Sequence, residues 1–339
     1  MPSSHVSISF PVEGASGVDE ARRVATTLAQ ALHFGEPDVD RVARVVTEAA
    51  ANVVQHAGHG EVLLRPIALG ASASLEVLAL DRGPGMANVA HALQDGFSTS
   101  GSRGLGLGAI ARLSTFFEMS SAPGKGTALL SRIGQVAPER EPGLECGVVC
   151  VAKRDEEVCG DAWAVSAGHG RDAVFIVDGL GHGLLAFQAA QRALRAFREH
   201  AGECPESSLK ALHEALRSTR GAVAAIAEID WGRRELHYAG AGNIAGTLVP
   251  VEGKEASLVS HGGTLGEMVT RFQEFTHPWP EQGLLVLHSD GLSSHWELEC
   301  YPGLTRKDPT LVAGVLYRDF ASRRDDVVVL VGRERGESA

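Results

Sequence analysis

The stretch "DGFSTSGSRGLGLGAI", Asp95 to Ile110, decides the interpretation of the first half of the chain. It places five glycines among the thirteen residues from Gly96 to Gly108, immediately before an apolar segment with helical spacing. Because an ordered glycine gives up more backbone freedom than any other residue, this composition has a physical cost. The chain must need unusual φ angles here, or something must approach the backbone more closely than a Cβ would allow.

Length, charge and cysteine content limit the classes of protein. The 339 residues are long for a single core, so two domains are predicted. A net charge of −11 argues against a general nucleic-acid binder, which needs a basic face. Five cysteines, an odd number, do not form a disulfide framework and are interpreted as reduced thiols. Without a membrane-spanning apolar run or a signal peptide, a soluble cytoplasmic protein with no membrane partner is expected.

A polar segment with two prolines, "APEREPG" from Ala137 to Gly143, is interpreted as a linker. The predicted organisation is a first domain over 1–137, a linker over 138–143 and a second domain over 144–339. Hydrophobic periodicity predicts helices over 18–32, 39–54, 184–200, 209–217 and 311–320, and a further helix from Leu107. Strand-like runs occur at 61–67, 74–80, 147–154, 162–168, 172–179, 223–230, 236–242, 284–291 and 326–332.

Three fragments of the first half carry groups suited to a nucleotide. "TEAAANVVQHAGHG" puts Glu48 and Asn52 four residues apart, hence on one face of a helix. "LDRGPGM" puts Asp81 at a strand end, and "GLGLG", 104–108, leads into a helix N-terminus, which attracts anions. Each fragment alone also fits a solvated helix face, a turn or a flexible loop. Together they offer an acid and an amide for a proton and a metal, an acceptor for an amino-purine, and a phosphate cradle.

The order E-x-x-x-N, D-x-G-P-G, G-x-G-x-G and "GKGT", 124–127, resembles the GHKL ATPase and kinase superfamily. Within it, the chain looks most like the serine/threonine kinases of bacterial partner-switching systems, the RsbT-like and anti-sigma-factor kinases, over roughly residues 5–135. The resemblance implies an α/β sandwich with a mixed sheet and helices on one face, which binds ATP with Mg²⁺.

This resemblance also assigns roles to residues. It implies that Glu48 is the catalytic base, that Asn52 binds Mg²⁺, and that Asp81 holds the adenine amino group. The segment 86–103 would be an ATP lid. The other implied nucleotide contacts are Gly83 and Gly85 in the adenine pocket, Gly104, Gly106 and Gly108 around the phosphates, and Thr127 on the adenine side.

In the second half, four aspartates stand at strand ends or turns: Asp161 in "CGDAW", Asp178 in "VDGLGHG", Asp290 in "HSDGL" and Asp325 in "RRDDVVVLV". Carboxylates at a sheet rim suit hard divalent ions such as Mg²⁺ or Mn²⁺. Two such ions activate water and orient a phosphoryl group for attack. Asp-Gly is also a common turn pair, but four aspartates beside apolar strands favour a metal site.

With "YAGAGNIAGTLV" and "GGTLG", this pattern resembles the metal-dependent PPM protein phosphatases of the SpoIIE/RsbX-like branch, over roughly residues 144–333. The resemblance implies an αββα sandwich with two antiparallel sheets, so that the whole chain is an α+β protein of two domains. It implies two Mn²⁺ or Mg²⁺ ions. Asp178, the catalytic residue, would bridge them, with the Gly179 carbonyl beside it. Asp290 and Asp325 would complete the second ion's shell, and Asp161 would hold metal-bound water.

One feature of the family lacks a clear counterpart in the sequence. Eukaryotic PPM enzymes grip the phosphate with an early arginine, and here only Lys153 and Arg154 lie nearby, neither of which can be matched. Asp326 is the poorer ligand candidate, because its side chain should point to the opposite face of the strand from that of Asp325. His182 is interpreted as a turn residue rather than a general acid.

Two functions remain open at this point. The first is a bifunctional partner-switching enzyme, a serine/threonine kinase fused to a phosphoserine/phosphothreonine phosphatase. Its implied partners are STAS-domain antagonists or stressosome proteins, with a sigma factor or a downstream phosphatase beyond them. The second is a phosphatase whose first half only senses nucleotide or docks a partner. Related anti-sigma kinases often pair, so a homodimer is also left open.

Overall fold

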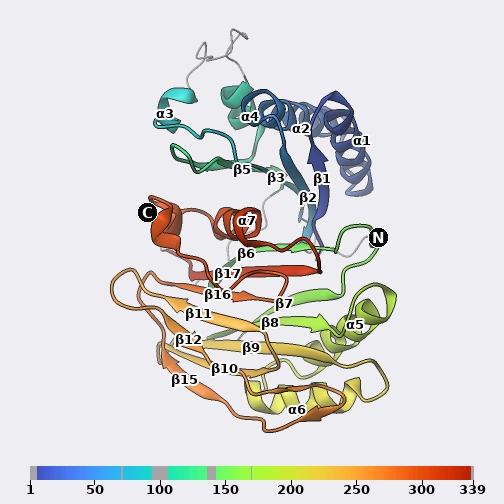
Figure 1. Cartoon of the computed structure of the whole chain (residues 1–339), viewed down its shortest axis with the longest axis vertical. Helices are drawn as coiled ribbons and strands as arrows, with labels where there is room; N and C mark the ends of the chain where they lie inside the picture. The colour runs from blue at the N-terminus through green and yellow to red at the C-terminus, as the bar shows by residue number, and fades with distance from the viewer. Residues whose placement is uncertain (1–5, 70–71, 94–105, 136–142, 169, 337–339) are drawn as a thin grey trace. The chain divides into compact units, whose positions relative to one another are not determined.

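The structure is a computed structural model that describes residues 6–69, 72–93, 106–135, 143–168 and 170–336. Its residues fall into two compact units (Figure 1). The first unit combines residues 1–139 with 297–318, and the second combines 140–296 with 319–339. The predicted linker lies outside the described residues except for Gly143. The first unit therefore includes a segment, 297–318, from late in the sequence.

The first unit contains a five-stranded sheet with the order β1-β2-β3-β5-β4. Its strands are β1 (Ile8–Val12), β2 (Gly60–Leu69), β3 (Ser72–Asp81), β4 (Phe116–Ser121) and β5 (Thr127–Gly134). All its described pairings are antiparallel, so the prediction of a mixed sheet is wrong. For two of these pairs the spacing in the sequence explains the direction: β3 starts three positions after the end of β2, and β5 six positions after the end of β4, too close for the long crossover that a parallel pair needs.

Helices α1 (Ala15–Ala31), α2 (Glu36–Ala57) and α4 (Gly106–Leu113) cover one face of this sheet (Figure 1), and a short α3 (Val89–Ala92) precedes α4 in the chain. The predicted helices over 18–32 and 39–54 are confirmed. Proline in the first turn of α2 and Gly58 at its end, with φ 75°, suit a helix start and stop. Alternate residues of β3, such as Val77 and Ala79, join the helices in one apolar core.

The opposite face of the sheet is covered by α7 (Pro309–Phe320), from the late segment of the first unit. A Cβ on Gly314 would lie 2.7 Å from Cδ2 of Leu78 and 3.3 Å from Cδ2 of Leu80, so the helix backbone packs directly against leucine side chains of β3. Two 3₁₀ turns, η1 (Leu298–Cys300) and η2 (Leu304–Arg306), precede it. The helices predicted on one face are thus joined by one on the other, because leucines on both faces need cover.

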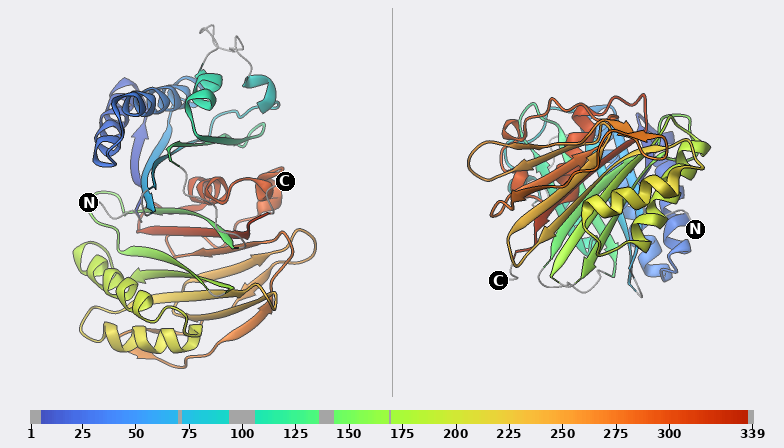
Figure 2. Two further views of the ribbon diagram at one scale, coloured as in Figure 1. Left: turned by 180° about the vertical axis from the view of Figure 1, so that it is seen from behind. Right: turned by 90° about the horizontal axis from the view of Figure 1, so that it is seen from below.

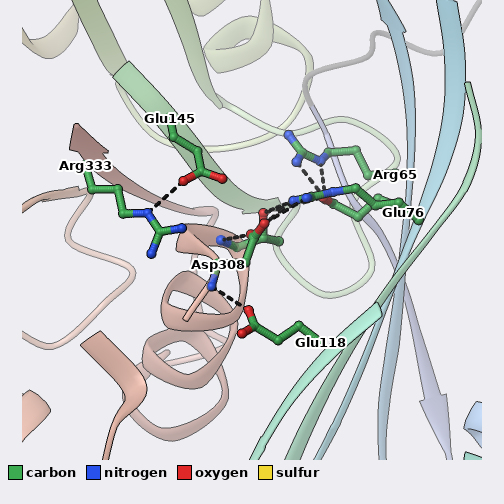
Figure 3. Close-up of polar contacts among 8 residues, drawn as sticks. Arg65, Glu76, Glu118, Glu145, Asp308 and Arg333 are labelled. Carbon is green, nitrogen blue, oxygen red and sulfur yellow. Dashed lines mark hydrogen bonds and ion pairs between the residues drawn. The ribbon is translucent and has the colours of Figure 1, made fainter. Parts of the chain in front are cut away.

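A buried set of ion pairs surrounds this contact, and we call it the arginine–carboxylate cluster (Figure 3). Arg132 donates Nη1 to Oδ2 of Asp308 at 2.7 Å, Nη2 to Oδ1 at 3.0 Å, and Nε to Oε2 of Glu76 at 2.9 Å. Arg65 donates to Oε1 of the same Glu76 at 2.6 Å. The Asp308 amide donates to Oε2 of Glu118 at 2.7 Å. Each acid in the cluster is therefore matched by a donor.

The second unit contains two five-stranded antiparallel sheets, stacked face to face in Figures 1 and 2. One has the order β15-β10-β9-β8-β7, from β7 (Asp161–Gly168), β8 (Arg171–Gly179), β9 (Ala222–Asp230), β10 (Glu235–Ala241) and β15 (Phe275–Pro278). The other has the order β12-β11-β16-β17-β6, from β6 (Leu144–Val151), β11 (Ala245–Val249), β12 (Ala256–Leu258), β16 (Leu284–His288) and β17 (Val327–Glu334).

Helices α5 (Leu184–Glu199) and α6 (Pro205–Leu216) pack on the sheet that contains β8 and share its apolar core. A small hairpin, β13 (Gly263–Thr264) with β14 (Met268–Val269), completes the unit. The predicted α+β class and the antiparallel sheets of the second half are confirmed.

Candidate functional sites

The first site lies where α2 meets the beginning of α4. A Cβ on Gly106 would lie 3.3 Å from Oε2 of Glu48 and 3.3 Å from Oδ1 of Asn52. Both predicted side chains therefore converge on the helix start that the glycine-rich stretch precedes. Gly108 is buried two residues further along α4. Gly104 and the predicted lid residues after Leu93 lie outside the described residues.

Asn52 has an unsatisfied polar atom. Its Nδ2 is buried and has no hydrogen-bond partner among the described residues. Buried polar atoms are nearly always paired, so an orphan of this kind is compatible with a ligand that the chain itself does not supply. The amide and the Glu48 carboxylate beside it suit a hydrated Mg²⁺ ion with bound phosphate.

Asp81 ends β3 and is only 9% exposed. Its Oδ1 accepts hydrogen bonds from the backbone amides of Gly83 at 2.8 Å and Thr127 at 3.1 Å. Burial raises the pKa of Asp81, and these two amides oppose the increase. Because both bonds use Oδ1, the carboxylate is held in a fixed orientation.

Two glycines around Asp81 are required by the protein itself. Gly85 has φ +69°, and a Cβ there would lie 1.9 Å from the Ala122 carbonyl oxygen. Gly126, which the prediction did not include, has φ +67°, and a Cβ there would lie 2.1 Å from the Asp81 carbonyl oxygen. Ser121 also escaped prediction: its hydroxyl accepts from the Met86 amide and donates to the Gly126 carbonyl, both at 2.9 Å. The "GKGT" motif was the available signal.

The second site is a cavity of about 320 Å³ in the second unit. Three predicted aspartates meet there, although the first and the last are 147 positions apart in the chain: Asp178 at the end of β8, Asp290 after β16, and Asp325 before β17. The other lining residues are Leu180, Gly181, Val223, Gly242 and Asn243.

Asp161 lies directly opposite Asp178 across the β7–β8 pairing. Its Oδ2 accepts from the Ser289 hydroxyl at 2.6 Å, and its buried Oδ1 has no hydrogen-bond partner among the described residues. Burial raises the pKa of Asp161, and the charge of Asp178 raises it further. Burial, followed by repulsion from Asp290 and Asp325, raises the pKa of Asp178 to about 8. Adjacent carboxylates that repel one another are stabilised by cations.

Asn243 is a site residue that sequence reasoning missed. Its Nδ2 donates to Oδ2 of Asp290 at 2.8 Å and so orients that carboxylate in the cavity. The polar end of "GAGN", after an apolar strand, was the available signal. Asp326, by contrast, accepts from the Lys153 and Gly160 amides at 2.8 and 2.9 Å and does not line the cavity.

The other predicted residues, and the histidine and cysteines considered with them, pack against or bond to neighbouring residues of the chain or are free thiols. Gly179 is buried, and a Cβ there would lie 2.2 Å from the Ala186 carbonyl oxygen of α5. Thr127 Oγ1 lies 3.1 Å from Ser121 Oγ, and Gly83 lies against Ala57. His182 is half-exposed and bonded to Glu156 at 2.6 Å. All five cysteines are free thiols.

The donor set of the cavity fits hydrated hard ions. Among the described residues, no three histidine, cysteine, aspartate or glutamate side chains converge tightly enough to form a closed metal cluster. Mg²⁺ ordinarily keeps several waters and takes one or two carboxylates from the protein. Carboxylates spaced around one cavity, with an orphaned oxygen on Asp161, match that manner of binding.

Comparisons with known proteins match both halves of the chain. A histidine kinase-like ATPase domain profile matches residues 12–132, and a stage II sporulation protein E (SpoIIE) profile matches residues 168–333. The serine/threonine-protein kinase RsbT of Bacillus subtilis (strain 168) is 35% identical over 109 residues, which are 32% of this chain and 82% of RsbT. The chain joins an RsbT-family kinase-like domain to a SpoIIE-type PPM phosphatase domain.

Relatives of the phosphatase half support this assignment. The phosphoserine phosphatase RsbX of Bacillus subtilis (strain 168) is 24% identical over 200 residues, 58% of this chain and 97% of RsbX. A solved chain from the bacterial stressosome, described as a modular system adapted to control secondary messenger signaling, has 28% identity and a TM-score of 0.52; it aligns with 56% of this chain over its whole length.

A crystal structure of RsbX in complex with magnesium shares the fold, with 22% identity and a TM-score of 0.50, over 58% of this chain and 98% of that one. The SpoIIE profile and the likeness to RsbX make the second half a PPM-type serine/threonine phosphatase domain. Together with the RsbT-like domain, they support a partner-switching regulator. In the described part of the chain, no helix is both long and apolar enough to cross a membrane.

Proposed function

We propose that the chain is a bifunctional partner-switching enzyme, with an ATP-dependent serine/threonine kinase over 1–137 and a metal-dependent phosphoserine/phosphothreonine phosphatase over 144–339. The observation that carries the proposal is the convergence of Asp178, Asp290 and Asp325 in one cavity of a chain that also brings Glu48 and Asn52 to a glycine-led helix start. STAS-domain antagonists of a stressosome or sigma-factor pathway are the proposed substrates, supported by the relatives' names.

In the phosphatase half, Asp178, Asp290 and Asp325 would hold two Mg²⁺ or Mn²⁺ ions, with the Gly179 carbonyl as a further ligand. When bound, such ions supply an activated water and orient the phosphoryl group. Asn243 keeps Asp290 turned into the cavity through its 2.8 Å bond. Ser289 holds Asp161 in place, so that its free oxygen would accept from an ordered water.

In the kinase half, Glu48 would accept the proton of the substrate hydroxyl, and Asn52 would hold the Mg²⁺ that accompanies ATP. The Oδ2 of Asp81 would accept from the adenine amino group, because the amides of Gly83 and Thr127 occupy Oδ1. Phosphoryl transfer depends mainly on positioning and charge neutralisation, which the helix start at Gly106 would provide for the phosphates.

Labelled ATP and a STAS-domain protein from the same host test this proposal. We expect wild type to label the STAS protein transiently, Glu48→Ala to leave it unlabelled, and Asp178→Asn to accumulate label because removal fails. Asp40→Asn, an exposed change on the same helix as Glu48, should behave as wild type. If wild type binds ATP but transfers nothing, the first half is a nucleotide-sensing or docking module, which is the alternative function.

A further inference from the structure

The described lining of the phosphatase cavity carries negative charge and no positive charge from the protein. Among its described lining residues there are three aspartates and no lysine or arginine. Two divalent ions would be balanced by these aspartates together with Asp161. A phosphate monoester brings two further negative charges, so its binding calls for an additional cation. Neither Lys153 nor Arg154, the candidates that the sequence offered, lines the cavity.

Arg220 lies at the edge of this cavity. Gly181 lines the cavity and has φ +84°, and a Cβ there would lie 3.4 Å from both Nη1 and Nη2 of Arg220. The guanidinium therefore lies against the backbone of a lining residue, and the side chain is exposed. The positive φ of residue 181 favours glycine, and a Cβ there would be in ordinary contact with the guanidinium.

The turn that carries Arg220 is fixed by hydrogen bonds. The Leu180 amide, beside Gly181, donates to the Gly221 carbonyl at 3.1 Å. The Gly221 amide donates to the Thr219 hydroxyl at 3.1 Å, and the Thr219 amide donates to the Leu216 carbonyl at 2.9 Å. The turn is therefore attached both to the cavity loop and to the end of α6.

We propose that Arg220 binds the phosphoryl oxygens of the substrate at the cavity rim, an inference that rests on the proposed phosphatase function. A planar guanidinium binds two phosphoryl oxygens at once, which a lysine does not do. Arg220 would thus supply from the α6–β9 turn the positive charge that the cavity lining lacks.

Arg220→Ala tests the proposal against Arg217→Ala, an exposed arginine three residues earlier that pairs with Glu214. For Arg220→Ala we expect about a tenfold rise in KM for p-nitrophenyl phosphate, with kcat changed less than about threefold. The dissociation constant of inorganic phosphate from the Mn²⁺-loaded protein should rise by about the same factor, while Mn²⁺ affinity stays unchanged. Arg220→Lys should recover part of the loss, and Arg217→Ala should match wild type.

Phosphate binding without turnover separates this inference from the function on which it rests. Arg220-dependent phosphate binding by a protein that hydrolyses nothing would remove the phosphatase function and keep the role of Arg220. Hydrolysis and phosphate binding that are both indifferent to Arg220→Ala, or equally affected by Arg217→Ala, would overturn the inference.

A second, independent observation concerns the segment 297–318. The chain leaves the second unit after Trp296, beyond Asp290, and returns at Asp319, ahead of Asp325. Close to both points, an isolated antiparallel β-bridge pairs Leu292 with Ala321. There the Ser293 amide donates to the Phe320 carbonyl at 3.0 Å, and the Ser322 amide donates to the Gly291 carbonyl at 2.9 Å. We call these two bonded segments, 291–293 and 320–322, the neck. The cavity aspartates Asp290 and Asp325 lie close to it in the sequence, one before the first segment and one after the second.

Within the first unit, the same segment reaches the strand end that carries Asp81. Arg318 donates Nη1 to the Asp81 carbonyl at 3.0 Å, and the Arg318 carbonyl accepts from Arg82. The Tyr317 hydroxyl donates to Oε1 of Glu61 at 2.9 Å. The C-terminal end of the segment is thus hydrogen-bonded to the backbone of Asp81, the candidate adenine-binding residue.

We infer that the segment 297–318 couples nucleotide binding at Asp81 to the neck between Asp290 and Asp325. Amide hydrogen exchange tests this, with ADP and Mg²⁺ as the probe. In wild type, ADP should change exchange in 291–296 and 319–325 by about threefold or more. Arg318→Ala, or Arg318→Lys if the first variant fails to fold, should still bind ADP but lose this change. Arg217→Ala should keep it.

The outcomes are distinct. ADP that binds without altering exchange at the neck would overturn the coupling alone. ADP that does not bind would overturn both the coupling and the nucleotide site. An exchange response that persists unchanged in the Arg318 variants would overturn the path through this segment.

Discussion

Two groups of buried carboxylates in this chain are made of the same residue types and have opposite electrostatics. In the arginine–carboxylate cluster of the first unit, Glu76 and Asp308 are each 3% exposed and are paired with Arg65 and Arg132. In the phosphatase cavity of the second unit, the aspartates face one another, and no described lining residue is basic.

The pKa shifts of the two groups differ accordingly. Burial by itself would raise the pKa of Asp308, but Arg132 together with hydrogen bonds from Thr310 outweighs it, and the pKa lies below its ordinary value. Burial and the neighbouring acids raise the pKa of Asp178 to about 8. Burial alone therefore does not distinguish a structural carboxylate from a functional one; the presence of a matching protein cation does.

Asp178→Asn should produce the largest effect. We expect Mn²⁺-dependent hydrolysis of p-nitrophenyl phosphate to fall on the order of 1,000-fold, because the cavity loses its central metal-binding carboxylate. Circular dichroism should show a folded protein, since the neutral amide removes repulsion. Retained hydrolysis would mean that the cavity aspartates do not hold the metals.

Arg132→Ala breaks the balanced cluster. Removing the shared cation leaves Glu76 and Asp308 buried without it, and about 3 kcal/mol of unfolding free energy should be lost. All four tryptophans, Trp163, Trp231, Trp279 and Trp296, lie in the second unit. The stability of the first unit is therefore measured by hydrogen exchange of β3 and β5. Arg217→Ala, which removes an exposed ion pair with Glu214, is the control, with no measurable loss expected. Equal losses in both variants would contradict the distinction.

The pH dependence of stability should have opposite signs in the two units of the metal-free protein. The folded pKa of Asp178 is about 8 against an ordinary 3.8, so the folded state keeps a proton that the unfolded chain loses. The free energy of unfolding of the second unit should therefore fall by a few kcal/mol as the pH rises from about 4 to about 8. For Asp308 the pKa is lowered, so its contribution is present above about pH 4 and lost below it.

Urea unfolding across this pH range measures both effects, with tryptophan fluorescence for the second unit. Asp178→Asn should make the fall in stability with rising pH smaller. In wild type, added Mn²⁺ should restore the stability that is lost at high pH. A second unit whose stability rises from pH 5 to pH 8 without metal would contradict the assigned repulsion.

Glu118→Gln should have the smallest effect. Glu118 accepts from the Asp308 amide at 2.7 Å and pairs with Lys307 at 3.1 Å, at the partly exposed edge of the cluster. An amide oxygen still accepts from the backbone, so about 1 kcal/mol or less should be lost in the same exchange measurement. A loss as large as that of Arg132→Ala would show that charge balance does not organise the cluster.

Local sequence determined the positions of the groups that act, because period and turn chemistry are local. Helical spacing put Glu48 and Asn52 on one face of α2, and apolar runs ending in Asp-Gly put Asp178 and Asp290 at strand ends. The strand-end aspartates could therefore be predicted, together with the two families. The antiparallel order of the first sheet, predicted as mixed, could not.

Only the tertiary structure brought α7 to the first unit's sheet, Asn243 to Asp290, and Arg220 to the cavity rim. These contacts join residues that are 39 to more than 200 positions apart, and the periodicity of a helix or strand carries no information about such partners. Arg132 and Asp308, for example, are separated by 176 residues. Their pairing depends on packing and on the desolvation of charge, which are properties of the folded chain.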